Sequence, residues 1–472
     1  MESILQNINW QAVLDKTWFS FWQSLLTVYI SLLLGGGLAV LEYFLKSRPS
    51  KIFLFLCSLP IFLPGLVVAT GFMAIWGNAG YVNELLSLFD ISPIKFLYSP
   101  FGIIAGHCFY NIPLAYLALA TRLTLADRKQ EEAGQIAGGS SWQVFFLITW
   151  PRLKNTAIGI GLLIFLYCFT SFNLPLILGG IKYQTLEVYI YSLAVEQYNF
   201  FASVALGIFQ FIFLLIIVFI FLKFLRTVSE KNVQSNAPYQ VSFQWSLFIL
   251  RFLLAVFLVA PLLALLAKGV NMDIIRIWRT DFTMALLRTY SLIFISIFIS
   301  LFFNGFILYK IKNAGKWLVL FLAISPAVVG IALLLIFGKS LLVLVAAYTV
   351  LMLPLSYFLL SSLWQSRPKY FLETLAILGA NKTQKAMVIA GYLRPAILKV
   401  IALSFAFTLG DVALSSLLTP FLQPTAMSYS YQLLGSYRFG LASSALCVIL
   451  LNIILMIIII YNYDFRSKRS HG

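Results

Sequence analysis

Charged side chains make up only 10% of this 472-residue chain, and histidine and cysteine are rarer still. The two histidines, His107 and His471, are too few for a histidine-based metal site. The four cysteines show no CxxC or Cys/His spacing, so we expect neither disulfides nor a thiolate metal site. No Ser/His/Asp grouping or paired carboxylate indicates catalysis. The scarce chemical groups therefore argue against an enzyme and against a metal centre.

Apolar residues, by contrast, dominate the chain. Hydrophobic residues make up 61% of it, aromatic residues 16%, and the mean hydropathy is +0.93, far outside the range of soluble domains. About eleven continuous apolar stretches approach the roughly 20 residues that a helix needs to cross a bilayer. Their apolar residues do not alternate, which argues against a β-barrel. The sequence predicts an all-α polytopic membrane protein in contact with lipid, with spans near 18–44, 52–76, 100–122, 156–180, 201–226, 244–267, 284–309, 317–338, 341–363, 396–420 and 440–462.

The basic residues are distributed unevenly between the loops. Of the 33 lysines and arginines, 22 fall in six alternate loops and seven in the loops between these. Because basic loops stay in the cytoplasm, this predicts an outside N-terminus and a cytoplasmic C-terminus. The net charge of +17 is therefore a topology signal and needs no nucleic-acid partner.

An internal repeat divides the sequence into two copies. Glu132 follows Pro113 by the same interval at which Glu373 follows Pro354, and the two copies are offset by 241 residues here. Further on, FTSFN (169–173) resembles FTLGD (407–411) at an offset of 238. We expect a first repeat of about five spans at 1–230, a polar cytoplasmic linker at 231–243, and a second repeat of about six spans at 244–472.

Each copy has a polar loop with helix-capping signals, at 131–151 and 373–395. Ser140 and Asn381 are N-cap residues, and each has a glutamine three positions later, as in a capping box. Gly138 and Gly379 suit the left-handed turn that ends a preceding short helix. We expect Pro151 to stop the second helix. The pattern predicts two helix-turn-helix elbows; membrane-interface packing is the alternative for one such loop, but a matched pair favours a docking surface.

These two loops resemble the EAA loop of ABC importer permeases. The first loop matches at Glu132, Ala133, Gly134, Gly138, Ile148 and Pro151. The second matches at Glu373, Gly379 and Ile389, but Thr374 and Leu375 replace small residues and the proline, Pro395, comes late. The resemblance implies a type I importer permease fold in which these residues dock onto a cytoplasmic ATPase.

Because both loops lie on one chain, the resemblance implies two copies of this ATPase. ATP and Mg would be bound by that partner, and no cofactor by this chain. The nearest match to a P-loop, Gly338-Lys339-Ser340, lacks the glycine that should stand five positions before Gly338. We therefore expect a transport subunit without an ATPase site of its own.

Five further stretches are similar to the bacterial thiamine or thiamine pyrophosphate permease: FSFWQSLL (19–26), YSPFGIIAGHCFYNIPLA (98–115), CFTSFNLPLILGG (168–180), TLGDVALSSLL (408–418) and YSYQLLGSYR (429–438). This resemblance implies an inner-membrane permease that receives thiamine, or its phosphates, from a periplasmic binding protein. Ferric iron importers of the same fused architecture are the alternative, and a secondary transporter or a membrane enzyme is less well supported. Members of the family usually have one more N-terminal span, and we expect this chain to begin after it.

One acidic residue is expected deep in a span. Asp411 would lie about fifteen residues into the span near 396–420, where ionisable groups are costly and usually functional. Its carboxylate could attract the thiazolium cation, or it could hydrogen-bond a neighbouring helix, and both interpretations stay open. Asn173 is the expected repeat-related partner of Asp411 on the translocation pathway. Glu42 is expected to pair with Lys46, one turn away.

Overall fold

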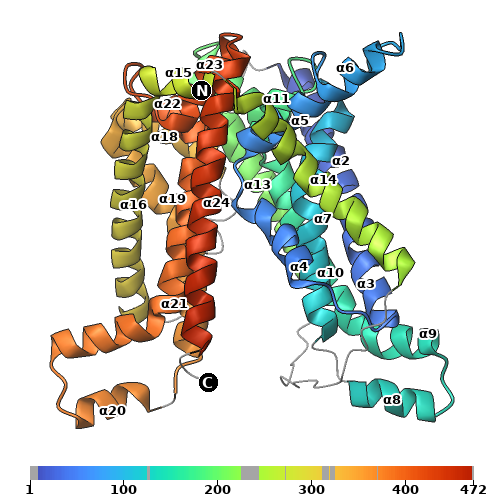
Figure 1. The fold of residues 1–472 in the computed structure, drawn as a ribbon. Coiled ribbons are helices and arrows are strands. Elements are labelled where there is room, and N and C mark those ends of the chain that lie inside the picture. The colour runs from blue at the N-terminus through green and yellow to red at the C-terminus, as the bar shows by residue number, and fades with distance from the viewer. Residues whose placement is uncertain are drawn as a thin grey trace. The chain divides into compact units, whose positions relative to one another are not determined.

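The computed structural model describes residues 9–124, 128–224, 244–271, 273–310, 318, 325–368 and 370–469 (Figure 1). Regular structure in these residues is helical, without strands, and ten helices are long and apolar enough to cross a membrane. This confirms the predicted all-α polytopic fold, and the chain is a multi-pass membrane protein. The linker expected at 231–243 lies outside the described residues.

The chain forms two compact units, which are described separately. Unit 1 comprises residues 1–61 and 65–267, and unit 2 comprises residues 62–64 and 268–472. Helix α14 (Trp245–Gly269) follows the expected linker in sequence but packs almost entirely in unit 1. The ring of its Phe257 lies 6.1 Å from that of Phe72 and 6.2 Å from that of Phe109. The packing boundary thus falls later than the expected repeat boundary, which stays a prediction.

A buried polar network connects three helices of unit 1. Gln23 is fully buried, and its Oε1 lies 3.0 Å from Nδ1 of His107. Its Nε2 donates to the carbonyl oxygen of Cys168 at 3.2 Å. These bonds satisfy polar groups that would be costly to bury alone. The helical segments of the unit before α14 are α2 (Trp10–Ser31), η1 (Leu32–Gly36), α3 (Gly37–Phe44), α4 (Lys51–Ser58), η2 (Leu59–Phe62), α5 (Gly65–Trp76), α6 (Tyr81–Ser87), α7 (Pro100–Thr124), α8 (Arg128–Ile136), α9 (Ser141–Val144), η3 (Phe145–Thr149), α10 (Trp150–Phe169), α11 (Asn173–Leu178), α12 (Leu186–Val195) and α13 (Phe200–Phe224).

Unit 2 repeats a tertiary contact of unit 1. The backbone N–H of Leu186, at the start of α12, donates to Oγ of Ser20 at 2.8 Å. The N–H of Ala426, at the start of α23, donates to Oγ1 of Thr289 at the same distance. The segments of unit 2 are α15 (Asp273–Arg276), η4 (Ile277–Arg279), α16 (Phe282–Lys310), α18 (Pro326–Phe337), α19 (Leu341–Gln365), α20 (Phe371–Ile377), α21 (Lys382–Leu409), α22 (Ala413–Leu418), α23 (Ala426–Gly435) and α24 (Phe439–Arg469). This contact is therefore common to the two units, as an internal repeat predicts.

Several expected spans are shorter or more broken than the hydropathy pattern indicated. The described part of the expected span at 317–338 holds the 12-residue helix α18. The expected spans 156–180 and 396–420 both break, because α10 ends at Phe169 and α21 at Leu409. In each copy a short helix follows after three residues. The hydropathy pattern misses these breaks because the residues around them are as apolar as those of an unbroken transmembrane helix.

The structure corrects the register of the repeat beyond the elbows. The ends of α10 and α21 and the starts of α11 and α22 are all 240 residues apart. This register pairs Asp411 with Ser171, whereas Asn173 pairs with Ala413. The offset falls from 241 to 240 because the first copy contains a π-helical turn, η3, where α21 is regular. A π turn accommodates one extra residue in a helix.

Candidate functional site

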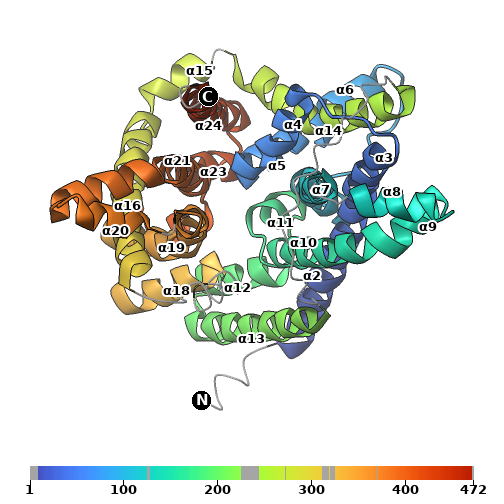
Figure 2. The same cartoon turned by 90° about the horizontal axis from the view of Figure 1, so that it is seen from below.

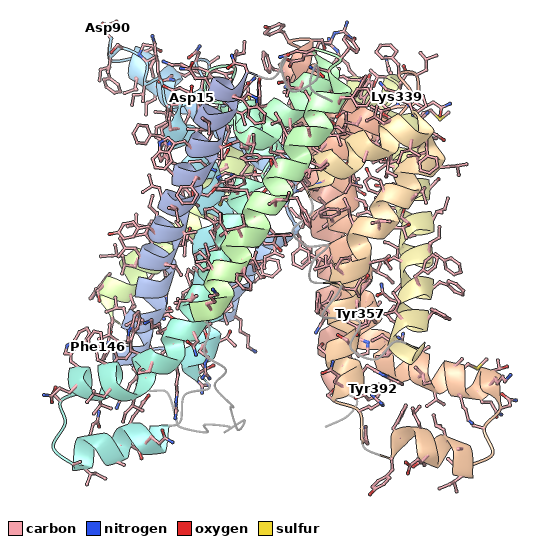
Figure 3. All side chains as sticks on the ribbon, turned by 180° about the vertical axis from the view of Figure 1, so that it is seen from behind. Asp15, Asp90, Phe146, Lys339, Tyr357 and Tyr392 are labelled. Atoms are coloured by element: carbon pink, nitrogen blue, oxygen red, sulfur yellow. The ribbon has the colours of Figure 1, made fainter. Side chains whose placement is uncertain are left out.

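Each unit presents an elbow of two helices at one end. In unit 1 the elbow consists of α8, α9 and η3, and in unit 2 of α20 and the first turns of α21 (Figure 1). Figure 2 shows α8 and α9 of the first elbow from below. Within unit 1, Phe146 of the elbow and Asp90 lie at opposite ends, and so do Tyr392 and Lys339 within unit 2 (Figure 3). Each elbow is thus at the end opposite to the loop that precedes α7 or α19.

Both predicted capping boxes are present. Oγ of Ser140 accepts from the N–H of Gln143 at 3.3 Å, and the N–H of Ser140 donates to Oε1 of Gln143 at 2.9 Å. Asn381 and Gln384 make the same pair of bonds at 2.8 and 2.9 Å. These bonds satisfy N–H groups at the start of the second elbow helix.

The predicted left-handed glycines are also confirmed. Gly138 has φ +89° and Gly379 has φ +67°. After the turn, the N–H of Gly139 donates to the carbonyl oxygen of Gly134 at 3.0 Å, and the equivalent bond closes the second elbow at 3.1 Å. This is the pattern of a Schellman motif, for which glycine carries the smallest conformational penalty. The two elbows therefore share one backbone design.

A glycine also allows α8 to approach α9 and η3 closely. A Cβ atom on Gly134 would lie 3.1 Å from Cγ2 of Val144 and 3.2 Å from Cδ1 of Ile148. Both distances are tighter than most real Cβ contacts. Gly134 and Ile148 therefore shape the elbow from within, whereas Glu132 and Ala133 are exposed on α8.

Side-chain contacts between the two arms differ between the elbows. In the first, Oγ1 of Thr149 donates to Oε1 of Glu131 at 2.6 Å, and Nη2 of Arg152 donates to Oε1 of Gln130 at 2.7 Å. In the second, the matching contact is aromatic: the ring centroids of Phe371 and Tyr392 are 5.3 Å apart. The pairs Gln130–Arg152 and Phe371–Tyr392 correspond at offsets of 241 and 240, as the π turn requires.

Each elbow exposes an isoleucine at the same repeat position. Ile136 ends α8 and is 88% exposed, and Ile377 ends α20 and is 85% exposed. They are 241 residues apart, and each stands two residues before the left-handed glycine. Apolar side chains at matched tips form a surface suited to a groove on a partner.

Neither proline of the elbows ends a helix. Pro151 was expected to stop the second elbow helix, but residues 141–169 form one continuous helical stretch. A proline inside a helix has no N–H to donate, and its ring clashes with the preceding turn. The π turn η3 comes immediately before Pro151 and changes the backbone hydrogen bonding at this point, so the helix continues. Pro395 likewise lies inside α21, and Ile389, also on this helix, is half-buried.

Asp411 lies in the break between α21 and α22 and not within a helix. Its carboxylate accepts from the N–H of Leu414 at 3.3 Å, from the N–H of Ser415 at 2.8 Å and from the hydroxyl of Tyr348 at 3.1 Å. The bond to Tyr348 on α19 supports the interpretation that Asp411 binds a neighbouring helix. Asn173 begins α11, and its Oδ1 is buried without a hydrogen-bond partner among the described residues.

The expected Glu42–Lys46 ion pair is wrong. Helix α3 ends at Phe44, and Lys46 has φ +50°, so it has left the helical face that carries Glu42. Glu42 instead pairs with Arg251 on α14, with 2.8 Å between Oε1 and Nε. Sequence reasoning missed this pair because its members are 209 residues apart. It also missed the fully buried Glu187, whose Oε2 accepts from Gln210 at 2.6 Å.

Comparison with known families agrees with this geometry. Residues 31–233 match the family described as the inner membrane component of binding-protein-dependent transport systems. This segment contains the first elbow and most of unit 1. This part of the chain is thus similar to permeases of that family, in agreement with the resemblance to ABC importer permeases.

Three of the similar proteins are thiamine permeases by name. The chain is 33% identical over 220 residues to the thiamine transport system permease protein of Haemophilus influenzae, which covers 46% of this chain and 40% of that protein. It is 28% identical over 272 residues to the same-named protein of Escherichia coli, covering 54% of this chain and 48% of the relative. It is 26% identical over 476 residues to that of Brucella abortus, covering 93% and 86%. The first two matches therefore span less than half the length of those relatives.

Proposed function

We propose that this chain is the permease subunit of an ATP-driven ABC importer. The observation that carries the proposal is the pair of matched elbows, which share capping boxes, left-handed glycines and the exposed Ile136 and Ile377. The family match over residues 31–233 supports it. Two elbows on one chain suit two copies of a cytoplasmic ATPase, which would bind ATP and Mg, together with a periplasmic binding protein.

The elbows would face the cytoplasm of a bacterium, with this chain in the inner membrane. The basic residues that flank them predict this orientation by the positive-inside rule. The docking surface would include Glu132, Ala133, Gly138 and Pro151 of the first elbow and Glu373, Gly379, Ile389 and Pro395 of the second. Within the first elbow, Gly134 and Ile148 would act by setting the spacing of the arms.

Thiamine, or one of its phosphates, is the proposed substrate. The names of the three relatives support this, and one of these matches extends over 93% of the chain. Asp411 and Asn173 are proposed to lie along the translocation pathway, where the carboxylate of Asp411 would favour a cationic ring. Two repeated units provide the halves that alternating access requires.

Uptake of radiolabelled thiamine into cells that lack their own transporter tests this function. The cells would express the chain with its candidate ATPase and binding protein, and ferric iron would be tested in parallel. We expect thiamine uptake that is lost when the ATPase is omitted. Uptake of iron alone would overturn the substrate, and uptake without the ATPase would overturn the importer class.

A further inference from the structure

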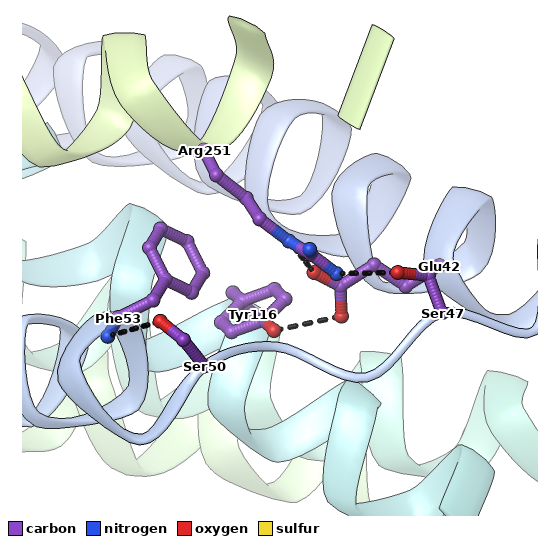
Figure 4. Close-up of polar contacts among 6 residues, drawn as sticks. All are labelled: Glu42, Ser47, Ser50, Phe53, Tyr116 and Arg251. Carbon is purple, nitrogen blue, oxygen red and sulfur yellow. Dashed lines mark hydrogen bonds and ion pairs between the residues drawn. The ribbon is translucent and has the colours of Figure 1, made fainter. Parts of the chain in front are cut away.

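A buried ion pair attaches the beginning of α14 to α3 inside unit 1 (Figure 4). Arg251 donates from Nε to Oε1 of Glu42 at 2.8 Å and from Nη2 to Oγ of Ser47 at 3.3 Å. The other carboxylate oxygen of Glu42 accepts from the hydroxyl of Tyr116 on α7 at 2.7 Å. The side chains of Arg251 and Glu42 are 19% and 6% exposed. One carboxylate therefore joins α3, α7 and α14.

Stability alone does not account for such a pair. Burying two charges carries a desolvation penalty, and well-packed apolar residues in their place are often equally stable or more so. The surroundings are apolar enough for that, because Phe53 packs edge-on against Tyr116 with 5.4 Å between the centroids. The charged pair contributes geometric specificity, because a guanidinium bonded to two acceptors fixes the position of α14 along α3.

The same short helix also contacts the first elbow. Tyr43 and Phe44 directly follow Glu42, and the ring of Phe44 lies 4.6 Å from that of Trp142 and 5.0 Å from that of Phe145. The ring of Tyr43 lies 5.9 Å from that of Phe145. Helix α3 is thus bonded to α14 on one side and packed against the elbow on the other.

Helix α3 is separated from α2 by the π-helical turn η1, which ends at Gly36. Mid-helix π turns are frequent at functional sites. Gly35 packs so closely on α7 that a Cβ atom there would lie 2.2 Å from the carbonyl oxygen of Ile112. The first span therefore consists of two parts, and the part after the π turn contacts α7, α14 and the elbow.

We propose that Glu42 and Arg251 are positioning residues that couple α14 to the first elbow, so that α14 moves when the elbow is displaced. This rests on the proposed function, in which the ATPase displaces the elbow. Displacement would pass through Trp142 and Phe145 to Phe44, along α3 to Glu42, and then through Arg251 to α14. A helix from the second half of the sequence would in this way be driven by the elbow of the first half.

The test measures ATP hydrolysis and thiamine import together, in proteoliposomes that contain the chain, its ATPase and its binding protein. We expect Arg251→Met to retain the ATPase and its hydrolysis but to raise the ATP consumed per thiamine imported by at least about fivefold, a typical coupling effect. Arg251→Lys should recover part of the loss, because its ammonium group keeps the charge opposite Glu42. The control is Phe252→Met, which places the same side chain at an exposed position on α14 and should leave the ratio unchanged.

A wild-type ratio in Arg251→Met would overturn the proposal and leave the pair a structural one. If this variant does not fold, Tyr116→Phe removes only the hydroxyl bond to Glu42 and should still raise the ratio about twofold, as the loss of one hydrogen bond allows; an unchanged ratio would again overturn the proposal. Failure of the wild-type chain to retain the ATPase would instead refute the proposed function.

Discussion

The close packing of Gly134 gives a prediction for the first elbow. A leucine at this position would place its Cβ atom 3.1 Å from Val144 and 3.2 Å from Ile148, with its remaining atoms further into the same contact. The arms α8 and η3 would have to separate. Since Thr149 and Arg152 bond across the same contact, separation would also lengthen these hydrogen bonds.

The free-energy cost of Gly134→Leu follows from the close apolar packing around this glycine. Overpacking a close apolar contact costs about 1 to 3 kcal/mol. That range corresponds to a factor of about 5 to 150 in the equilibrium between a packed and an opened elbow. We therefore expect Gly134→Leu to lower ATPase-dependent thiamine uptake by at least about fivefold. The spans should stay folded, because the altered contact lies in the elbow.

The assay compares uptake, ATPase co-purification and membrane insertion for Gly134→Leu and for Gly159→Leu. Gly159 lies on α10, and no atom would lie within 4 Å of a Cβ there, so the same substitution should be tolerated. Normal uptake and co-purification in Gly134→Leu would show that elbow packing is not needed for docking, and this would refute the reasoning.

The remaining predictions concern Asp411. The single carbonyl oxygen of an asparagine can still accept from the N–H of Ser415 and the hydroxyl of Tyr348, which share one oxygen of Asp411. Asp411→Asn should therefore keep the fold but raise the KM for thiamine at least about fivefold, given that a charge pair near 4 Å is worth about 1 kcal/mol even in water; uptake kinetics like those of the wild type would exclude a role for the charge. Tyr348→Phe removes one of the three donors to this carboxylate and should lower the free energy of unfolding by about 1 kcal/mol, with KM unchanged; a raised KM would show that the hydroxyl itself contributes to the pathway.

Local signals in the sequence predicted most of the elbow. Ser140 and Asn381 with their glutamines, and Gly138 and Gly379 at positive φ, act through bonds within a few residues, so a short stretch of sequence is enough to identify them. Pro151 misled for the same reason, because a local rule for proline cannot anticipate the π turn before it.

Contacts between distant residues could not be predicted in this way. Arg251 is far from Glu42 in sequence, and the nearer Lys46 was the natural partner until the end of α3 was known. The pairing of Asn173 with Asp411 failed because it relied on the short match of FTSFN with FTLGD at an offset of 238, whereas the helix ends lie 240 residues apart. The breaks at Thr170 and Gly410 were hidden because the residues around them are as apolar as those of a continuous helix.

Accessibility of the two elbow tips tests the central claim most directly. Ile136→Cys and Ile377→Cys would place thiols at highly exposed positions, whereas the four native cysteines are buried. Labelling with a membrane-impermeant maleimide, with and without the bound ATPase in detergent, reports whether the tips are covered. Docking at both elbows predicts rapid labelling of each thiol in the isolated chain and strong protection of both in the complex. Equal labelling of both thiols with and without the ATPase would contradict it.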